Sequence, residues 1–294
     1  SLSFFNDTAT TEIYTLSLHD ALPICPQRER PRKSRPAPER PRTPDGLEPV
    51  YGVHAVRALF AREQPPRVLW VQQGHAEQRL DDLLAQAHAA GCELKRVTRE
   101  VLDALSGPAA HQGVVGFCPP LVAENETALW WRLEQWQGET PPLLLILDGI
   151  TDPHNLGACL RSADAAGVHG VIVPKDKSAP LNATVRKVAC GAAESVPVFQ
   201  VTNLARCLEK LKQQGVWITG TAGEADTLLF EADFSGPCAL VMGAEGKGMR
   251  RLTREACDAL VKLPMQGQVT SLNVSVAAGV CLFEVVRQRH AARG

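Results

Sequence analysis

The stretch LLLILDGITDPHNLGACLR, residues 143–161, decides the fold class of this chain. Its first part, residues 143–150, is a nearly continuous apolar run, which is typical of a strand buried on both faces of a parallel sheet. An Asp-Pro pair at 152–153 then favours a turn, and Asn155 can cap the start of a helix. Apolar residues recur at helical spacing over residues 156–163, so the stretch predicts a buried strand followed by a packed helix.

The carboxyl-terminal half of the chain repeats this alternation of apolar runs and helical stretches. It closes in a predicted helix over residues 271–289, with Val274, Ala278 and Leu282 on its buried face. Strands and helices that alternate in this way predict a doubly wound α/β domain with a buried parallel sheet. The further predicted strands are residues 170–174, 196–201, 215–219, 237–242 and 259–263.

A second, smaller α/β unit is predicted over residues 50–119, ending at the proline pair Pro119-Pro120. Residues 120–140 are expected to form a linker with one short helix, whose tryptophans we expect to pack between the two domains. The larger domain is predicted to cover residues 141–294. The helices predicted in the smaller unit are residues 51–60, 79–90 and 99–105, and its strands are residues 67–72, 93–97 and 113–117.

Two different segments precede the smaller unit. Residues 1–24 resemble a translated sequencing-adapter artefact, and a signal peptide is disfavoured because acidic residues interrupt any apolar core. Residues 25–49 are expected to form a disordered basic arm, since prolines exclude a helix and seven basic side chains oppose two acidic ones over residues 25–44. Such an arm attracts phosphate groups; a solvated linker or wrongly joined upstream sequence are the alternatives.

The composition excludes several classes of protein. The chain has 294 residues, a formal net charge of −1 and 45% hydrophobic residues, and no apolar run long enough to span a bilayer. These values exclude a wholly disordered chain, a multi-span membrane protein and a globally basic nucleic-acid binder. The nine cysteines lack zinc-site spacing, so we expect no metal, buried free thiols and a reducing, cytoplasmic location.

The helix after the first strand of the larger domain carries two polar residues that could act on a ligand. Ligands of open α/β sheets bind beyond the carboxyl ends of the strands. Asn155 stands near the start of this helix, and Arg161 lies off its apolar stripe beside small residues. Arg161 could therefore hold a phosphate or assist in removing a proton; an ordinary surface arginine is the alternative.

Two more loops follow predicted strands of the same sheet. The turn Gly243-Ala244-Glu245-Gly246-Lys247-Gly248-Met249 holds three glycines, which expose backbone N–H groups, but it lacks the spacing of a phosphate-binding or dinucleotide-binding loop. The segment 263–275 places Ser271, Asn273 and Ser275 at a helix start, which is more polar groups than capping alone requires.

The three loops together resemble the signature motifs of the SpoU/TrmH group, within the SPOUT class of RNA 2′-O-ribose methyltransferases. The matching residues are Asn155 with Arg161, the turn 243–249 and the segment 271–275, and the resemblance covers about residues 141–289. In the smaller unit, Tyr51-Gly52-Val53-His54-Ala55-Val56 and His111-Gln112-Gly113-Val114 resemble the substrate-binding domain of the bacterial 23S rRNA guanosine 2′-O-methyltransferases.

This resemblance implies a fold, a methyl donor and partners. The larger domain would be a SpoU-type methyltransferase domain with a deep trefoil knot, and the smaller one a ribosomal-protein-like RNA-binding domain. The methyl donor would be S-adenosyl-L-methionine, without a metal. The target would be a guanosine ribose 2′-hydroxyl in the peptidyl-transferase region of 23S rRNA or of a ribosomal precursor. The protein would be a homodimer that does not bind a membrane.

The resemblance also implies roles for individual residues. Arg161 would act at the 2′-hydroxyl, either through a substrate phosphate that accepts the proton or with its own pKa lowered. The other catalytic residues would be Asn155, Glu245, Ser271 and Asn273, and the donor-binding residues Gly243, Gly248, Leu263, Met265 and Leu272. Arg186 and Lys187 would contact RNA phosphates, or belong to a solvated helix face.

Three other functions compete with this interpretation. A tRNA guanosine 2′-O-methyltransferase of the same group is disfavoured by the separate domain over residues 50–119. A non-catalytic RNA-binding ribosome-assembly factor is disfavoured by the presence of Arg161 and Asn273. An oxidoreductase that uses a dinucleotide is disfavoured because the glycine fingerprint of such enzymes is missing.

Overall fold

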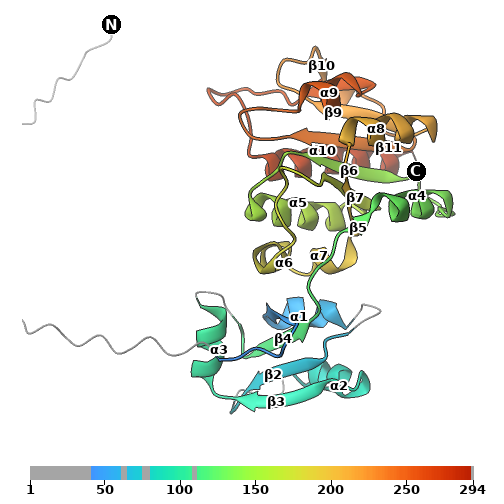
Figure 1. The fold of residues 1–294 in the computed structure, drawn as a ribbon. Helices are drawn as coiled ribbons and strands as arrows, with labels where there is room; N and C mark the ends of the chain where they lie inside the picture. The colour runs from blue at the N-terminus through green and yellow to red at the C-terminus, as the bar shows by residue number, and fades with distance from the viewer. Residues whose placement is uncertain (1–40, 61–64, 75–79, 108–110, 293–294) are drawn as a thin grey trace, which may run out of the picture. The chain divides into compact units, whose positions relative to one another are not determined.

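The computed structural model describes residues 41–60, 65–74, 80–107 and 111–292, and its strands form two sheets (Figure 1). The predictions for residues 1–24 and for the arm as far as residue 40 lie outside the described residues. Among the helices of the described part, none combines the length and the hydropathy that a membrane crossing requires.

The first sheet has four strands in the order β1-β4-β2-β3. β4 pairs antiparallel with both β1 and β2, while β3 pairs parallel with β2. One face packs against α1 and α2, and the other against α3, so apolar side chains cover both sides. The elements are β1 (Glu48–Tyr51), α1 (Val53–Leu59), β2 (Val68–Gln72), α2 (Asp81–Ala89), β3 (Glu93–Val97), α3 (Arg99–Ser106) and β4 (Val114–Cys118).

Strand β1 was not predicted; a helix over residues 51–60 was expected instead. The strand is only four residues long, and Val50 is its one fully buried side chain. Gly52, with φ of +91°, then turns the chain from β1 into α1. A strand this short carries too little alternation to be recognised, and pairing with β4 is what holds it in the sheet.

The second sheet has eight strands in the order β10-β12-β9-β11-β6-β7-β8-β5, and every pair in it is parallel. The predicted doubly wound α/β domain is therefore confirmed. β6 lies inside the sheet with all six residues buried, as its continuous apolar run predicts. The strands are β5 (Glu124–Asn125), β6 (Leu143–Asp148), β7 (Gly170–Pro174), β8 (Val198–Val201), β9 (Trp217–Thr221), β10 (Thr227–Leu228), β11 (Cys238–Gly243) and β12 (Ala259–Lys262).

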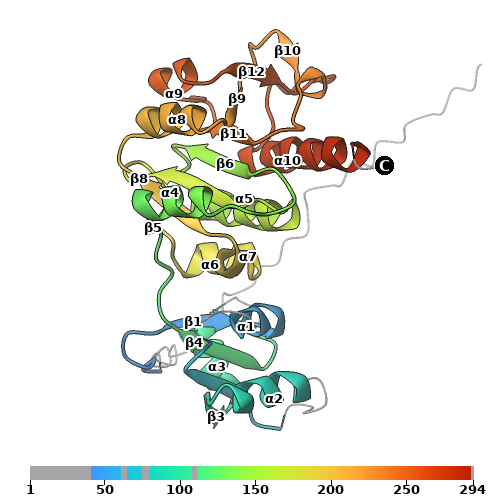
Figure 2. The same ribbon diagram turned by 90° about the vertical axis from the view of Figure 1, so that its right-hand side faces the viewer.

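Helices cover both faces of the second sheet (Figures 1 and 2). α5, α6, α7 and α10 enclose one apolar core, and α4 and α8 enclose the other. Figure 2 shows α10, in red, running alongside α5, against which it packs. The helices are α4 (Glu126–Glu134), α5 (Pro153–Ala165), α6 (Ala183–Ala189), α7 (Ala192–Ser195), α8 (Leu204–Gln213), α9 (Arg251–Glu255) and α10 (Val274–Ala291), with a short 3-10 helix at Leu229–Glu231.

Most of the predicted linker is part of this domain. β5 pairs with β8, and Asn125 caps α4 by accepting a hydrogen bond of 3.0 Å from the backbone N–H of Ala128. Trp130 packs in the core beneath α4, whereas Trp131 is 61% exposed. The expectation that the tryptophans pack between the domains is therefore wrong for these two, because α4 lies on the second sheet.

The carboxyl ends of β6 and β11 are joined side by side at the middle of the sheet. Their register places Asp148 opposite Gly243. The Asp148 carboxylate is fully buried and accepts hydrogen bonds from the backbone N–H of Arg250 at 2.8 Å and from its Nε at 2.6 Å. Since Arg250 follows the glycine-rich turn, this ion pair ties the end of that turn to the end of β6, and the pairing of Gly243 with Asp148 ties its start.

A half-buried histidine supports the other end of β6. Nδ1 of His169 accepts a hydrogen bond of 2.9 Å from the backbone N–H of Leu143, so it must be unprotonated. The edge of the Trp136 ring lies against the imidazole, with 4.1 Å between the ring centroids. Burial lowers the pKa of His169 from its usual value, which favours the neutral ring in the folded protein.

We predict that His169 makes the folded state sensitive to acid. Because the folded-state pKa is depressed, its contribution to stability is complete above about pH 6.5 and is lost as the pH falls through the folded pKa. Urea unfolding at pH 7.5 and pH 5.5 should show a smaller acid-induced loss for His169→Gln, which keeps an acceptor without titrating, than for the wild type. Equal losses in both proteins would contradict the prediction.

Candidate active site

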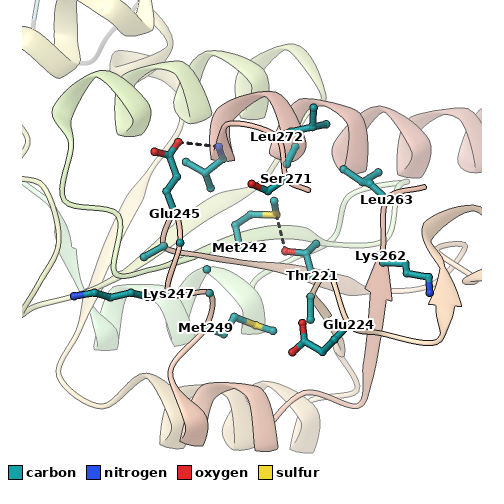
Figure 3. Close-up of a pocket in the computed structure, with 18 of the residues that line it drawn as sticks. Thr221, Glu224, Met242, Glu245, Lys247, Met249, Lys262, Leu263, Ser271 and Leu272 are labelled. Carbon is teal, nitrogen blue, oxygen red and sulfur yellow. Dashed lines mark hydrogen bonds between the residues drawn. The ribbon is translucent and has the colours of Figure 1, made fainter. Parts of the chain in front are cut away.

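A cavity of about 480 Å³ opens at the carboxyl ends of β9, β11 and β12. Three segments form most of its lining: residues 221–224 at the end of β9, residues 242–249 at the end of β11 and in the turn after it, and residues between 261 and 277 around the start of α10; Arg254 of α9 also lines it. Figure 3 shows Leu263, Ser271 and Leu272 on one wall, with Met249 and Glu224 across from them. The second and third predicted loops therefore meet in one cavity.

The glycine-rich turn folds back on itself with no space for a side chain at its start. Ala244 and Gly248 exchange two backbone hydrogen bonds, of 3.1 and 2.8 Å. A Cβ atom at Gly243 would lie 2.3 Å from the carbonyl carbon of Gly248 and from the backbone nitrogen of Met249. Only glycine permits this approach, and the turn thereby presents its backbone to the cavity.

Three polar side chains from the three loops form one hydrogen-bonded cluster beside the cavity. Nδ2 of Asn273 donates to Oε1 of Glu245 at 2.7 Å and to Oδ1 of Asn155 at 2.9 Å. Nδ2 of Asn155 donates to the same Glu245 oxygen at 3.3 Å. The structure thus brings together three of the predicted catalytic residues, from positions up to 118 residues apart in the chain.

The start of α10 completes this cluster. Asn273 is the N-cap, and its Oδ1 accepts hydrogen bonds from the backbone N–H of Ser275 at 2.9 Å and from the Ser275 hydroxyl at 2.6 Å. The backbone N–H of Val274 donates to Oε1 of Glu245 at 3.3 Å, the dashed line beside Glu245 in Figure 3. The Glu245 carboxylate therefore lies at the positive end of the helix dipole.

Asn155 is not the cap of α5, contrary to the sequence-based expectation. Asp152 is the N-cap, and its Oδ1 accepts a hydrogen bond of 2.9 Å from the backbone N–H of His154. Pro153 occupies the first turn, where it needs no N–H partner. Because Asp152 satisfies the helix end, the Asn155 amide is available to the cluster.

All five residues predicted to bind the donor line the cavity, and so does Ser271. A further wall, which was not predicted, is formed by residues 221–224 at the end of β9, where Thr221 donates a hydrogen bond of 3.1 Å to the carbonyl of Val241. Glu224, in the same segment, forms an ion pair with Arg254. That segment follows a predicted strand at the same sheet edge, so its position could have been found. The five predicted residues are Gly243, Gly248, Leu263, Met265 and Leu272.

Arg161 is exposed on α5 and does not line the cavity. Its Nη1 lies 3.6 Å from Sγ of Cys190, the residue that ends α6. The predicted buried stripe of α5 is present, with Leu156 and Leu160 fully buried. Within one chain, the structure therefore brings the glycine turn and the polar cluster together but leaves Arg161 outside their cavity.

Arg186 is buried, with 1% of its surface exposed, so the expectation that it contacts RNA is wrong. Its guanidinium is held by the carboxylates of Glu194 and Glu48. Lys187, the next residue, is exposed. Helical spacing predicts which residues share a face, but it cannot show that a neighbouring element covers that face.

The described cysteines are unpaired, and all are buried except Cys257, which is partly buried, and Cys190. Burial raises the pKa of Cys159, Cys207 and Cys281 to about 12, which keeps these thiols protonated. Cys190 is exposed instead and takes a left-handed conformation with φ of +53°.

A parallel sheet with a glycine-rich turn and a capped helix start at its carboxyl edge defines a class of α/β domains that bind a ligand beyond their strand ends. Comparison with known families makes the assignment specific. Residues 142–283 match the SpoU rRNA methylase family, and residues 49–122 match the RNA 2′-O ribose methyltransferase substrate-binding family. The chain belongs to the SpoU rRNA methylase family.

Curated relatives match the chain over nearly their whole length. A 23S rRNA (guanosine-2′-O-)-methyltransferase of Pseudomonas aeruginosa is 60% identical over 244 residues, covering 82% of this chain and 97% of the relative. The protein of the same name from Pseudomonas putida is 58% identical over 250 residues, covering 84% of this chain and 99% of the relative.

Solved structures agree with this assignment. The SpoU methyltransferase AviRb from Streptomyces viridochromogenes, in complex with the cofactor AdoMet, has a TM-score of 0.68 at 25% identity, covering 84% of this chain and 91% of that one. The crystal structure of an RNA 2′-O ribose methyltransferase has a TM-score of 0.69 at 29% identity, with 83% and 90% covered.

We predict that Gly243→Ala destabilises the fold far more than Gly246→Ala. At Gly243 the new methyl group meets backbone atoms that cannot move without opening the turn. At Gly246 no atom lies within 4 Å, and only the positive φ of +73° opposes alanine, which costs about 1–2 kcal/mol. Urea unfolding followed by circular dichroism compares the two variants. Similar losses in both would show that the turn is not closed as the structure has it.

Proposed function

We propose that this protein transfers a methyl group from S-adenosyl-L-methionine to the ribose 2′-hydroxyl of a guanosine in 23S rRNA. The observation that carries the proposal is the match to a 23S rRNA (guanosine-2′-O-)-methyltransferase at 58% identity over 99% of that relative's length. A match of this extent includes both the substrate-binding and the methyltransferase domains. The separate first domain, which favoured rRNA over tRNA in the sequence, supports the same substrate.

The cavity fits the methyl donor. Its volume lies within the usual range for small-molecule sites. Its floor is the glycine turn, whose backbone is available for hydrogen bonds, and Leu263, Leu272 and Met242 give it apolar walls. These residues would hold the donor, and Gly243 and Gly248 would let it approach the backbone closely. The bound sulfonium supplies an electrophilic methyl group, so this transfer needs no metal.

The cluster of Asn155, Glu245 and Asn273 would orient the target ribose. Oε1 of Glu245 already accepts hydrogen bonds from Asn273, Asn155 and the backbone of Val274. A carboxylate oxygen that accepts all these hydrogen bonds is poorly suited to act as a base, and better suited to position its neighbours. Ser271, on the cavity wall, would contribute its hydroxyl to the same end of the cavity.

Arg161 would act on the RNA rather than on the donor. Its guanidinium is exposed and able to hold a phosphate with two hydrogen bonds. A phosphate held there stands beside the 2′-hydroxyl that must lose its proton. Arg161 would then orient the phosphate, and the phosphate would accept the proton of the 2′-hydroxyl.

A homodimer is part of the proposal. Val276, Val280 and Phe283 recur at helical spacing on the outer side of α10 and are 52%, 38% and 50% exposed. Leu272, just before the helix, is also exposed. An apolar stripe beside the cavity is suited to a second copy of the same surface. A second copy would also bring another Arg161 to the assembly.

The knot and the location complete the proposal. β12 lies beyond β9 in the sheet, yet α10, which follows β12, packs against α5 and β11. The intervening segment must therefore cross back over the sheet's carboxyl edge, and this crossing supports the trefoil knot. A cytoplasmic location fits both an rRNA substrate and the unpaired thiols.

We predict that Arg161→Ala abolishes methyl transfer but leaves donor binding unchanged, because Arg161 lies outside the cavity. The assay uses the purified chain, tritiated donor and 23S rRNA, with tRNA as the competing substrate and the modified nucleotide mapped by primer extension. Loss of a positioned catalytic group should lower kcat by at least about a hundredfold. Arg206→Ala, an exposed arginine on α8, is the matched control. Full turnover by the Arg161 variant would remove this residue from the mechanism, and methylation of tRNA alone would refute the rRNA assignment.

We predict that Phe283→Glu weakens self-association, because it would place a charge in the apolar stripe of α10. The dimer Kd should rise by at least about tenfold, as sedimentation velocity measures it. Trp217→Glu, at an apolar side chain on β9 that is 53% exposed, should leave the dimer intact. An unchanged dimer in the Phe283 variant would place the interface elsewhere.

A further inference from the structure

Arg186 is the largest fully buried side chain among the described residues. It stands in the middle of α6 and donates three hydrogen bonds: from Nε to Glu194 at 2.7 Å, from Nη1 to Glu48 at 2.9 Å, and from Nη2 to the carbonyl of Pro119 at 3.0 Å. A charge this deeply buried persists only with partners of this kind.

The partners of Arg186 come from both domains. Glu194 belongs to α7, next to Arg186 in the methyltransferase domain. Glu48 begins β1 of the substrate-binding domain, and Pro119 directly follows its last strand, β4. Glu194 can neutralise Arg186 inside its own domain, whereas Glu48 reaches it only when the substrate-binding domain is docked on α6.

A second contact between the domains lies nearby and does not involve charge. Gly191 caps α7 with φ of +102°, and a Cβ atom there would lie 2.9 Å from Cβ of Ala58 on α1. The two backbones therefore approach as closely as this pair of small residues allows. A close-packed contact beside a buried ion cluster indicates one defined docking position for the substrate-binding domain.

The helix that receives this domain is also tied to Arg161. Cys190 ends α6 one turn after Arg186, and its sulfur lies 3.6 Å from Nη1 of Arg161. α6 also packs tightly on α5, since a Cβ atom at Gly157 would lie 2.9 Å from the carbonyl oxygen of Val185. The α5–α6 pair therefore links the docking position of the substrate-binding domain to the position of Arg161.

We propose that Arg186 is a positioning residue: by clamping Glu48 and Pro119 onto α6, it sets the distance between rRNA held by the substrate-binding domain and Arg161. This inference rests on the proposed function for its RNA, but not for the clamp itself. An rRNA that contacts both domains is bound with the right spacing only while the clamp is closed. When the clamp is open, RNA binding must also order the two domains relative to each other. This ordering costs free energy, and the cost raises the KM for RNA.

The test is Glu48→Gln. This substitution removes the one charge of the clamp that belongs to the substrate-binding domain and leaves the methyltransferase domain unchanged. Loss of a charged hydrogen bond should raise the KM for 23S rRNA by about tenfold, with little change in kcat at saturating RNA. The donor Kd, from calorimetry, should not change. Glu124→Gln is the matched control, because Glu124 is equally buried and pairs with Arg132, but within one domain.

A direct measurement of domain position separates the clamp from the proposed function. Spin labels on exposed sites of α2 and α8 should give one narrow distance distribution in the wild type and a broader one in Glu48→Gln, without any RNA present. In an Arg186→Met background, Glu48→Gln should add no further broadening or KM increase.

Two results would overturn the inference. One is a Glu48→Gln variant with the KM and label distances of the Glu124→Gln control. The other is a variant whose losses are equal in KM and donor affinity, which would indicate general unfolding. If the wild type methylates no rRNA while the label distances respond as expected, the proposed function fails and the clamp stands.

Discussion

The parallel pairing of β6 with β11 is the constraint on which the active site depends. It sets Asp148 opposite Gly243, so two loops that are distant in sequence leave the sheet at adjacent points. The buried Asp148 carboxylate then holds Arg250 through both its backbone and its side chain. Breaking such a pair by removing one partner leaves an uncompensated buried charge, so the turn between Gly243 and Arg250 is held firmly at both ends.

The polar cluster is likewise held in place by contacts between loops that are distant in the sequence. Asn155, Glu245 and Asn273 each come from a different loop, and each makes hydrogen bonds that fix the other two. Groups held in this way need little rearrangement when a ligand arrives, and such preorganisation is a general contribution to catalysis. The N-terminus of α10 contributes a backbone donor to the cluster and a favourable dipole for Glu245.

Arg186 is a basic residue that is used inside the protein rather than at its surface. Its charge is satisfied inside the protein by two carboxylates and a carbonyl group. Replacing such a cluster with apolar residues is often no worse for stability, which is why we assign the cluster a positioning role rather than a stabilising one. In the proposed clamp, the cluster sets the spacing between the substrate-binding domain and Arg161.

The sequence by itself determined the parallel sheet, the order of its elements and the three loops of the site. Continuous apolar runs report strands buried on both faces, and glycines and polar residues after those runs mark the carboxyl edge. Only the tertiary structure decided that β1 and β5 are strands, that Asp152 rather than Asn155 caps α5, that Arg186 is buried, and that Arg161 lies against Cys190 outside the cavity. The reason is that the spacing of apolar residues along a segment reports only which of its faces is buried. The partner of a buried charge or of a four-residue strand comes from a segment tens of residues away, and local spacing carries no record of it.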